Sequence, residues 1–160
     1  MNKFIKLKDK INNLSDFKFI LLSVILCMLL HCIFSLFYSI LNISDSSIGG
    51  PLLDSLDSVY IIISAILIGP LIETGMLIII VKVLRKFIKY DILNWVIVSL
   101  IFTFLHNYSI YYMTFILPGS FIFNYAYIFY KNKKLSIYWI MAIIHILCNS
   151  ISILINYIIT

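Results

Sequence analysis

Glu73 is the residue whose position most needs a chemical reason, because it is the single glutamate of the chain and lies in the apolar stretch 66–81. A charged acid at the centre of a membrane helix costs about 2.5–3.5 kcal/mol on insertion scales. Three more polar residues, His106, His145 and Asn149, also lie in apolar stretches. Such residues usually face the interior of a helix bundle or a water-filled cavity. The pattern therefore predicts one shared polar site.

The expected depths of these residues agree with a shared site. At 1.5 Å per residue, Glu73 lies about 13 Å from Lys82 and His145 lies about 16 Å from Lys134. On the same basis, His106 lies about 21 Å from Ile92, the first residue of its predicted span. Helix tilts of about 20° can close such differences. His145 and Asn149 are four residues apart and share one helix face. We therefore expect Glu73 to lie close to the His145/Asn149 pair, an arrangement that suits acid–base catalysis.

The composition indicates a membrane protein. The chain of 160 residues is 62% hydrophobic and 12% charged, whereas soluble domains are about 25% charged. Open sheets cannot satisfy their backbone groups in lipid, so the fold class is all-α, a polytopic transmembrane helix bundle. We expect a single membrane domain, 1–160. The net charge of +5 does not indicate nucleic acid, because the basic residues form short groups between apolar runs.

Five spans of roughly bilayer length are expected, with the first retained rather than cleaved as a signal. With the N-terminus cytoplasmic, every Lys and Arg falls on the cytoplasmic side, as the positive-inside rule requires. The polar loop with Asp45, Asp54 and Asp57 then lies outside. The chain is thus expected in the cell membrane, multi-pass, with cytoplasmic basic loops. The predicted spans are 19–41, 58–81, 92–106, 109–130 and 136–158.

Helix breakers occur in two of these spans. Gly69-Pro70 precedes Glu73, and Pro70 leaves the carbonyl of Ile66 without its helical donor. Pro118-Gly119 breaks the fourth span near its middle. Both a simple kink and a functional cavity are compatible with such breaks.

The remaining candidates receive structural interpretations. His31 has no partner of matching pattern, so we expect a hydrogen-bonded structural residue. Cys27, Cys32 and Cys148 lie in apolar runs without a C-x-x-C pair. They are expected to be small buried apolar residues, with no disulfide framework.

Two short motifs carry a family resemblance. "FTFLH" supplies Phe102 and His106, and "HILCN" supplies His145 and Asn149. With Glu73, their order resembles the CAAX protease and bacteriocin-processing (CPBP, or abortive-infection) family of intramembrane peptidases. A motif-bearing core of about 69–151 carries the similarity. The family's Glu-Glu-x-x-x-Arg motif is partly met, with Thr74 and Ile78 replacing its second Glu and its Arg.

The resemblance implies an intramembrane endopeptidase that works without a covalent intermediate. Glu73 and His106 would activate a water molecule, and His145 and Asn149 would donate hydrogen bonds to the oxyanion. A peptide or membrane-embedded protein would be the substrate, within the lipid bilayer, with no nucleic-acid partner. No cofactor is implied.

Three alternatives remain open. Glu73, His106 and His145 match a His₂Glu zinc set in composition, although H-E-x-x-H is absent and three helices would supply the ligands. The partial first motif is compatible with a non-catalytic bacteriocin self-immunity membrane protein. Buried Glu and His also serve small transporters or proton relays.

Overall fold

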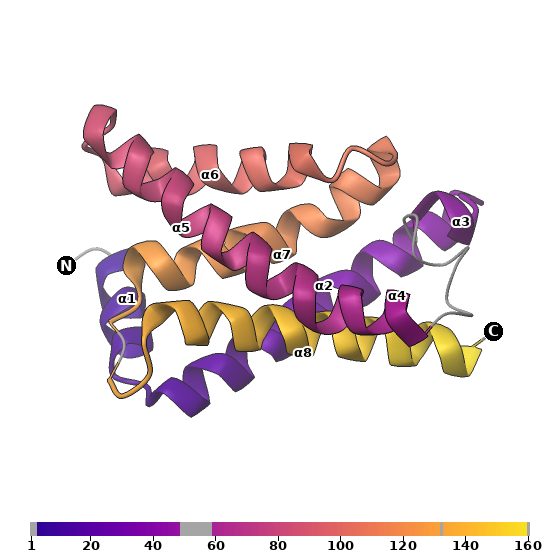
Figure 1. Ribbon diagram of the computed structural model, residues 1–160, viewed down its shortest axis with the longest axis horizontal. Coiled ribbons are helices and arrows are strands. Elements are labelled where there is room, and N and C mark those ends of the chain that lie inside the picture. The colour runs from indigo at the N-terminus through magenta and orange to yellow at the C-terminus, as the bar shows by residue number, and fades with distance from the viewer. Residues whose placement is uncertain (1–2, 49–58, 132, 160) are drawn as a thin grey trace.

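The computed structural model describes residues 3–48, 59–131 and 133–159, and every regular element among them is a helix (Figure 1). The all-α prediction is therefore confirmed. Asp54 and Asp57 of the predicted outer loop lie outside the described residues. The elements are α1 (Lys3–Asn12), α2 (Asp16–Ile40), α3 (Asp45–Ile48), α4 (Val59–Ile63), a π-helical turn (Ser64–Ile68), α5 (Gly69–Phe87), α6 (Asp91–Leu105), α7 (Ile110–Phe129) and α8 (Ile137–Ile159).

Helices occupy all five predicted span positions, and the molecule is a helical membrane bundle. By length and composition, three described helices can cross a membrane, namely Asp16–Ile40, Val59–Phe87 and Ile137–Ile155. Asp91–Leu105 is apolar but shorter, and α7 has 20 residues. Helix α5, which belongs to the second predicted span, continues beyond the predicted end at Val81 to Phe87. Its last turns, rather than a loop, therefore carry Lys82, Arg85 and Lys86. Basic charge at the end of a helix complements the helix dipole.

The first long helix separates a packed face from an apolar outer face. Phe19, Ser23 and Cys27, spaced four residues apart, are buried in the bundle. Leu22, Leu26, Leu29 and Ile33 are large apolar residues that remain exposed, each at 45% or more. In water such a surface would be a liability, whereas lipid chains are its natural solvent.

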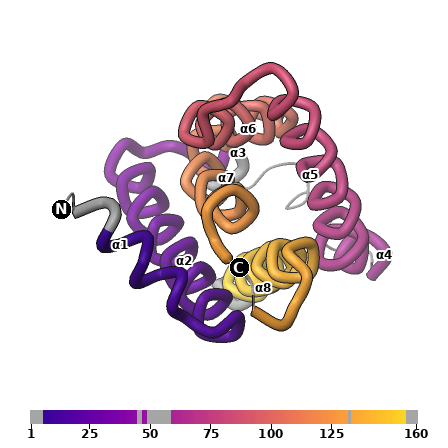
Figure 2. Tube along the Cα trace, turned by 90° about the vertical axis from the view of Figure 1, so that its left-hand side faces the viewer, coloured from indigo at the N-terminus to yellow at the C-terminus, as the bar shows by residue number. Residues whose placement is uncertain are grey.

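The helices surround α7, which contacts α2, α6 and α8, while α5 contacts α6 and α8 (Figure 2). The two predicted breakers do not end a helix. Pro118 lies inside α7, and the chain passes Gly69-Pro70 through the π-turn into α5. The polypeptide from Val59 to Phe87 is therefore one continuous helix that contains a π-helical turn.

Helix α1, the last turn of α5 and the α7–α8 connection lie at one end of the bundle (Figure 1), and all three carry basic residues. The amphipathic helix α1 was not predicted as an element; its Lys8 ammonium lies 5.0 Å from the centre of the Phe129 ring, at the end of α7. Nearby, the Asn12 side chain accepts a hydrogen bond of 2.9 Å from the backbone N–H of Lys131. The contacts tie the N-terminal segment to the α7–α8 connection.

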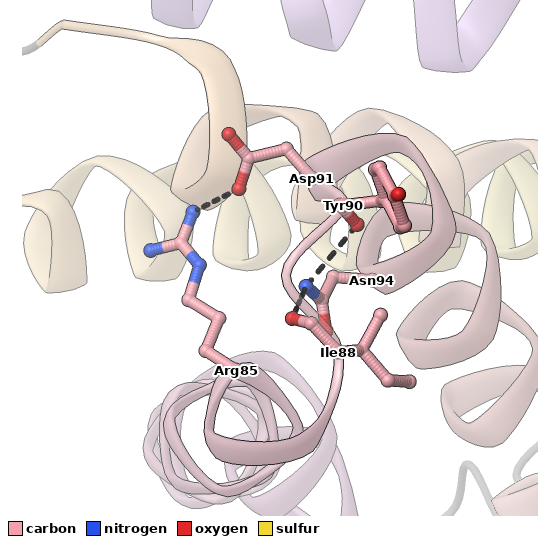
Figure 3. Close-up of polar contacts among 5 residues, drawn as sticks. All are labelled: Arg85, Ile88, Tyr90, Asp91 and Asn94. Atoms are coloured by element: carbon pink, nitrogen blue, oxygen red, sulfur yellow. Dashed lines mark hydrogen bonds and ion pairs between the residues drawn. The ribbon is translucent and has the colours of Figure 1, made fainter.

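A compact polar corner fixes α5 against α6 (Figure 3). The buried Asn94 amide donates to the carbonyls of Ile88 and Tyr90, at 2.8 and 3.2 Å. Nearer the surface than the Asn94 amide, Arg85 and Asp91 form an ion pair of 3.0 Å with both side chains partly exposed. A pair so exposed contributes little to stability, so the buried amide is the main polar constraint on the angle at which α6 leaves α5.

Asp16 anchors α2 to the α7–α8 connection. Its Oδ1 accepts from the Tyr130 hydroxyl (2.9 Å) and the Lys133 N–H (2.8 Å). Its Oδ2 accepts from the N–H groups of Lys134 (2.6 Å) and Leu135 (2.9 Å). One buried carboxylate therefore satisfies four donors from a segment more than 110 residues away in sequence.

Asp16→Asn is expected to lower the free energy of unfolding by about 1.5–3 kcal/mol, the value of hydrogen bonds to a charged group, because an amide supplies only one acceptor oxygen. Thermal unfolding of the purified protein in detergent measures the effect. Asp9→Asn is the matched control, because Asp9 is exposed on α1. Equal unfolding midpoints for the two variants would contradict the anchoring role.

Candidate active site

Glu73 lies on α5, one turn after Pro70, and faces both predicted histidines. Its Oε2 is 3.6 Å from His106 Nε2 and 3.7 Å from His145 Nε2. Both distances exceed a direct hydrogen bond. This carboxylate oxygen is buried and has no hydrogen-bond partner among the described residues. The acid from the second predicted span and the imidazoles from the third and fifth therefore surround one point.

Gly69 keeps space beside the acid. A Cβ atom at position 69 would lie 3.2 Å from the carbonyl oxygen of Ser64 and 3.5 Å from Glu73 Oε1. The first distance is tighter than ordinary contact, so a larger residue would press on the helix backbone next to the carboxylate. Glycine at this position thus leaves both the helix and the acid undisturbed.

His106 follows the last residue of α6, and its ring is oriented by its own helix. Its Nδ1 lies 2.9 Å from the carbonyl oxygen of Phe102, one turn earlier. A carbonyl only accepts hydrogen bonds, so Nδ1 carries the proton and Nε2 of the neutral ring is an acceptor. Nε2 faces Glu73 Oε2, another acceptor. A group that donates two hydrogen bonds, such as a water molecule, complements this pair.

Buried hydroxyl groups hold the helix that carries His106. Ser120 on α7 donates to the backbone oxygen of Ser99 on α6 at 3.1 Å. The hydroxyls of Ser120 and Thr103 lie 3.2 Å apart. The Asn124 amide adds a hydrogen bond to the Ser99 hydroxyl at 3.3 Å. These buried polar contacts fix the register of α6 against α7, and so the height of His106 in the bundle.

Aromatic rings pack around His145 on α8. Its ring centroid lies 4.8 Å from that of Phe123 and 5.8 Å from that of Phe102. The residue is 5% exposed. Packing on two sides restricts rotation of the imidazole, whose Nε2 is directed at Glu73.

Asn149 is held by the winding change that precedes Glu73. In the π-turn, the Gly69 N–H bonds to the Ser64 carbonyl, and Pro70 has no N–H to offer. The carbonyl of Ala65 thus loses both helical donors, and the Asn149 amide supplies one at 2.9 Å. The sequence predicted an orphaned carbonyl at Ile66; the side-chain donor is found at Ala65. Asn149 therefore connects α8 to the continuous helix 59–87, on which Glu73 lies.

The four predicted residues line one cavity of about 640 Å³. Residues to which no site role was assigned complete its wall. Of these, Tyr112 belongs to the tyrosine-containing segment 108–112 and Gly119 to the predicted Pro118-Gly119 break, and both signals are compatible with a site, whereas Phe123 carries none. They are Cys27, His31, Tyr60, Ile61, Ser64, Ala65, Gly69, Phe102, Leu105, Asn107, Tyr108, Tyr112, Ile116, Gly119, Phe123 and Cys148.

His31 is a hydrogen-bonded residue of the bundle, as expected. Its Nε2 lies 3.9 Å from Cys27 Sγ, and its ring stacks on Phe115 with centroids 4.5 Å apart. Cys27 and Cys148 are buried as expected, but Cys32 is exposed on the outer surface of the bundle. An apolar thiol is compatible with lipid, so the buried environment expected for all cysteines was too narrow.

Among the residues that the structure describes, metal-binding side chains do not gather in a coordinating arrangement. Within residues 3–48, 59–131 and 133–159, no group of three or more His, Cys, Asp or Glu side chains could hold a metal ion. The closest approach to a His₂Glu set is Glu73 with its two imidazoles, where the nitrogens are 3.6 and 3.7 Å from one oxygen.

The fold and the site together define a helical membrane protein with a polar cavity built around a carboxylate and two imidazoles. The profile of the family described as type II CAAX prenyl endopeptidase Rce1-like matches residues 54–151. This is more than half of the chain and includes all four predicted residues, so the chain belongs to this family of proteases. The predicted resemblance is confirmed, and the match begins earlier than the predicted core at 69. Searches found no significant match among curated proteins or solved structures.

Proposed function

We propose that the protein is an intramembrane endopeptidase in which Glu73 and His106 activate a water molecule. The observation that carries the proposal is the convergence of Glu73 Oε2 with His106 Nε2 and His145 Nε2 at 3.6 and 3.7 Å inside the cavity. A water molecule donating to Glu73 and His106 would direct its lone pairs at a peptide carbonyl. Its proton would pass to this acid–base pair and from there to the leaving amine as the C–N bond breaks, and no acyl-enzyme would form.

As the water attacks, the peptide carbonyl oxygen gains negative charge. His145 would donate to it from Nε2, and the Asn149 amide would donate with the proton that it does not share with Ala65. Such donors typically contribute about 2.7–4 kcal/mol each to transition-state stabilisation. The substrate would be a peptide or a membrane-embedded protein whose scissile bond enters the cavity.

The orientation in the membrane is part of the proposal. The basic residues of α1, of the end of α5 and of the α7–α8 connection gather at one end of the bundle. By the positive-inside rule this end would be cytoplasmic. The chain would then be a multi-pass protein of the cell membrane, with the cavity reached from within the bilayer.

Turnover in liposomes tests this function. The purified protein, reconstituted with a library of membrane-anchored peptides, is expected to produce defined cleavage products that mass spectrometry identifies. The combined variant Glu73→Gln, His106→Ala should produce none. Identical products from both proteins, or none from the wild type under reducing conditions, would overturn the proposal.

A chelator separates the metal-free reaction from its zinc alternative. The proposed mechanism predicts that the cleavage rate is unchanged after dialysis against a strong zinc chelator. Loss of activity that added zinc restores would instead assign Glu73, His106 and His145 to a metal.

In a protein acting only in bacteriocin self-immunity, cell protection would survive the combined variant.

A further inference from the structure

The candidate active-site cavity extends toward one end of the bundle and not toward the other. On α7 its lining residues run from Tyr112, in the first turn, to Phe123, and none comes from the described residues 124–129. On α6, which runs in the opposite direction, the lining begins at Phe102 and continues past the end of the helix, and none comes from the described residues 91–101. The cavity therefore lies toward the α6–α7 connection.

The exposure of the lining residues increases in the same direction. Phe123 and His145 are 6% and 5% exposed, whereas Tyr108 and Leu105, at the α6–α7 connection, are 45% and 56% exposed. Tyr60, at the start of α4, is 84% exposed. Figure 1 shows α4 and the α6–α7 connection at the end of the bundle opposite α1 and the α7–α8 connection. The floor of the cavity thus lies inside the bundle, and its mouth lies at the end away from α1.

The basic residues of the chain belong to the other end. All twelve Lys and Arg residues fall in the segments 3–18, 82–89 and 131–134. These segments include α1, the last turns of α5 and the α7–α8 connection, which lie away from the mouth (Figure 1). An excess of Lys and Arg marks the cytoplasmic side of a membrane protein. In that orientation the mouth of the cavity faces the outer side of the membrane.

We propose that the cavity opens at the outer face of the membrane and that its substrate is an amphipathic peptide delivered from that side. This inference rests on the proposed function and names its substrate class. Tyr60 and Tyr108 at the mouth combine an apolar ring with a polar hydroxyl, which suits the boundary between lipid and water. Ile61 and Leu105 add apolar surface beside them. A peptide that lies in the outer leaflet by its apolar face meets these side chains before it reaches Glu73.

The charges of the cavity indicate which bond of such a peptide is cut. Among the lining residues that the structure describes, none is Lys or Arg, and Glu73 supplies the only carboxylate. A substrate held by its C-terminal carboxylate would place that charge beside Glu73 without a cationic partner, which is costly away from water. The cleaved bond is therefore an internal one, and the C-terminus of the peptide stays outside the cavity.

The side on which the cavity opens is tested without any activity assay. Asn107→Cys changes an exposed residue of the mouth, and Lys133→Cys changes an exposed residue of the basic end as the matched control. Both are made in a Cys32→Ala background, which alone gives the background labelling. Right-side-out and inverted membrane vesicles from cells that express each variant are treated with a membrane-impermeant sulfonated maleimide.

The Asn107→Cys protein should be labelled only in right-side-out vesicles, and the Lys133→Cys protein only in inverted vesicles. Labelling of Asn107→Cys in inverted vesicles, or in neither kind, would overturn the proposal.

The side from which the substrate arrives is tested in both kinds of vesicle with the wild-type protein. Acyl-anchored peptides of the library are added from outside, and vesicles with the Glu73→Gln, His106→Ala variant report cleavage by other proteases. Cleavage should occur in right-side-out vesicles, be lost in intact inverted vesicles, and return when detergent opens the inverted ones. Cleavage in intact inverted vesicles would contradict delivery from the outer face. If opened vesicles show no difference between wild type and variant, the proposed function fails, while the maleimide labelling is read independently.

The position of the cut is tested with two forms of one cleaved peptide, which carry either a free or an amidated C-terminus. Both should be cut at the same internal bond and at the same rate. A requirement for the free carboxylate would show that the cavity recognises a C-terminus, and the assigned substrate class would be wrong.

Discussion

Glu73→Gln is expected to lower kcat/KM by about 10²–10⁴-fold, the range for loss of a general base. The amide has nearly the same size as the carboxylate, so the cavity and the packing of α5 should be retained. It cannot accept the proton of the attacking water, and it places an N–H₂ group or a weaker acceptor opposite His106 and His145. Most of the effect should appear in kcat, because in the proposed mechanism the carboxylate acts on the reacting water rather than on substrate binding.

The comparison needs a second acid that lies outside the cavity. Asp9→Asn removes a carboxylate from the exposed surface of α1, and its rate should equal that of the wild type. The unfolding midpoint of Glu73→Gln should not fall, since Glu73 is half-buried and its buried Oε2 has no hydrogen-bond partner, so removing the charge relieves a cost. A Glu73→Gln variant that cleaves at the wild-type rate would assign the base to another group.

Hydropathy predicted the helices well because lipid leaves few alternatives. A backbone without water must satisfy itself, so long apolar stretches become helices, and their positions follow from composition. The residues at which the helices end were less predictable. The helix of Glu73 continues to Phe87 because Lys82, Arg85 and Lys86 are compatible with its last turns, and sequence reasoning had treated those charges as a loop signal.

The members of the candidate site were predictable, but their mutual contacts were not. A lone acid in an apolar segment is costly wherever it faces lipid, so Glu73 could be identified without a structure. The hydrogen bond between Asn149 and Ala65 depends on a π-turn that forms where Gly69 and Pro70 change the helical winding. Tertiary packing of α8 selects that winding, and a single segment does not encode it.

His145→Ala is expected to lower kcat by about 10²–10³-fold, as for the loss of an oxyanion donor. The imidazole is packed between Phe102 and Phe123 with Nε2 3.7 Å from the acid, so alanine removes the donor and leaves no side chain to replace it. His31→Ala is the matched control in reducing buffer, because His31 lines the same cavity but contacts Cys27 and Phe115 rather than Glu73. Its rate should remain that of the wild type.

A loss of activity through disturbed packing alone would mimic this result, since His145 is buried. His145→Gln distinguishes the two causes, because it restores an amide donor of similar reach without restoring the aromatic contacts. Partial recovery of kcat at an unchanged KM would identify the hydrogen bond to the oxyanion as the function of His145. If His145→Gln and His145→Ala are equally slow while His31→Ala also loses activity, the cavity as a whole requires its imidazoles for packing, and the assignment of His145 as an oxyanion donor is wrong.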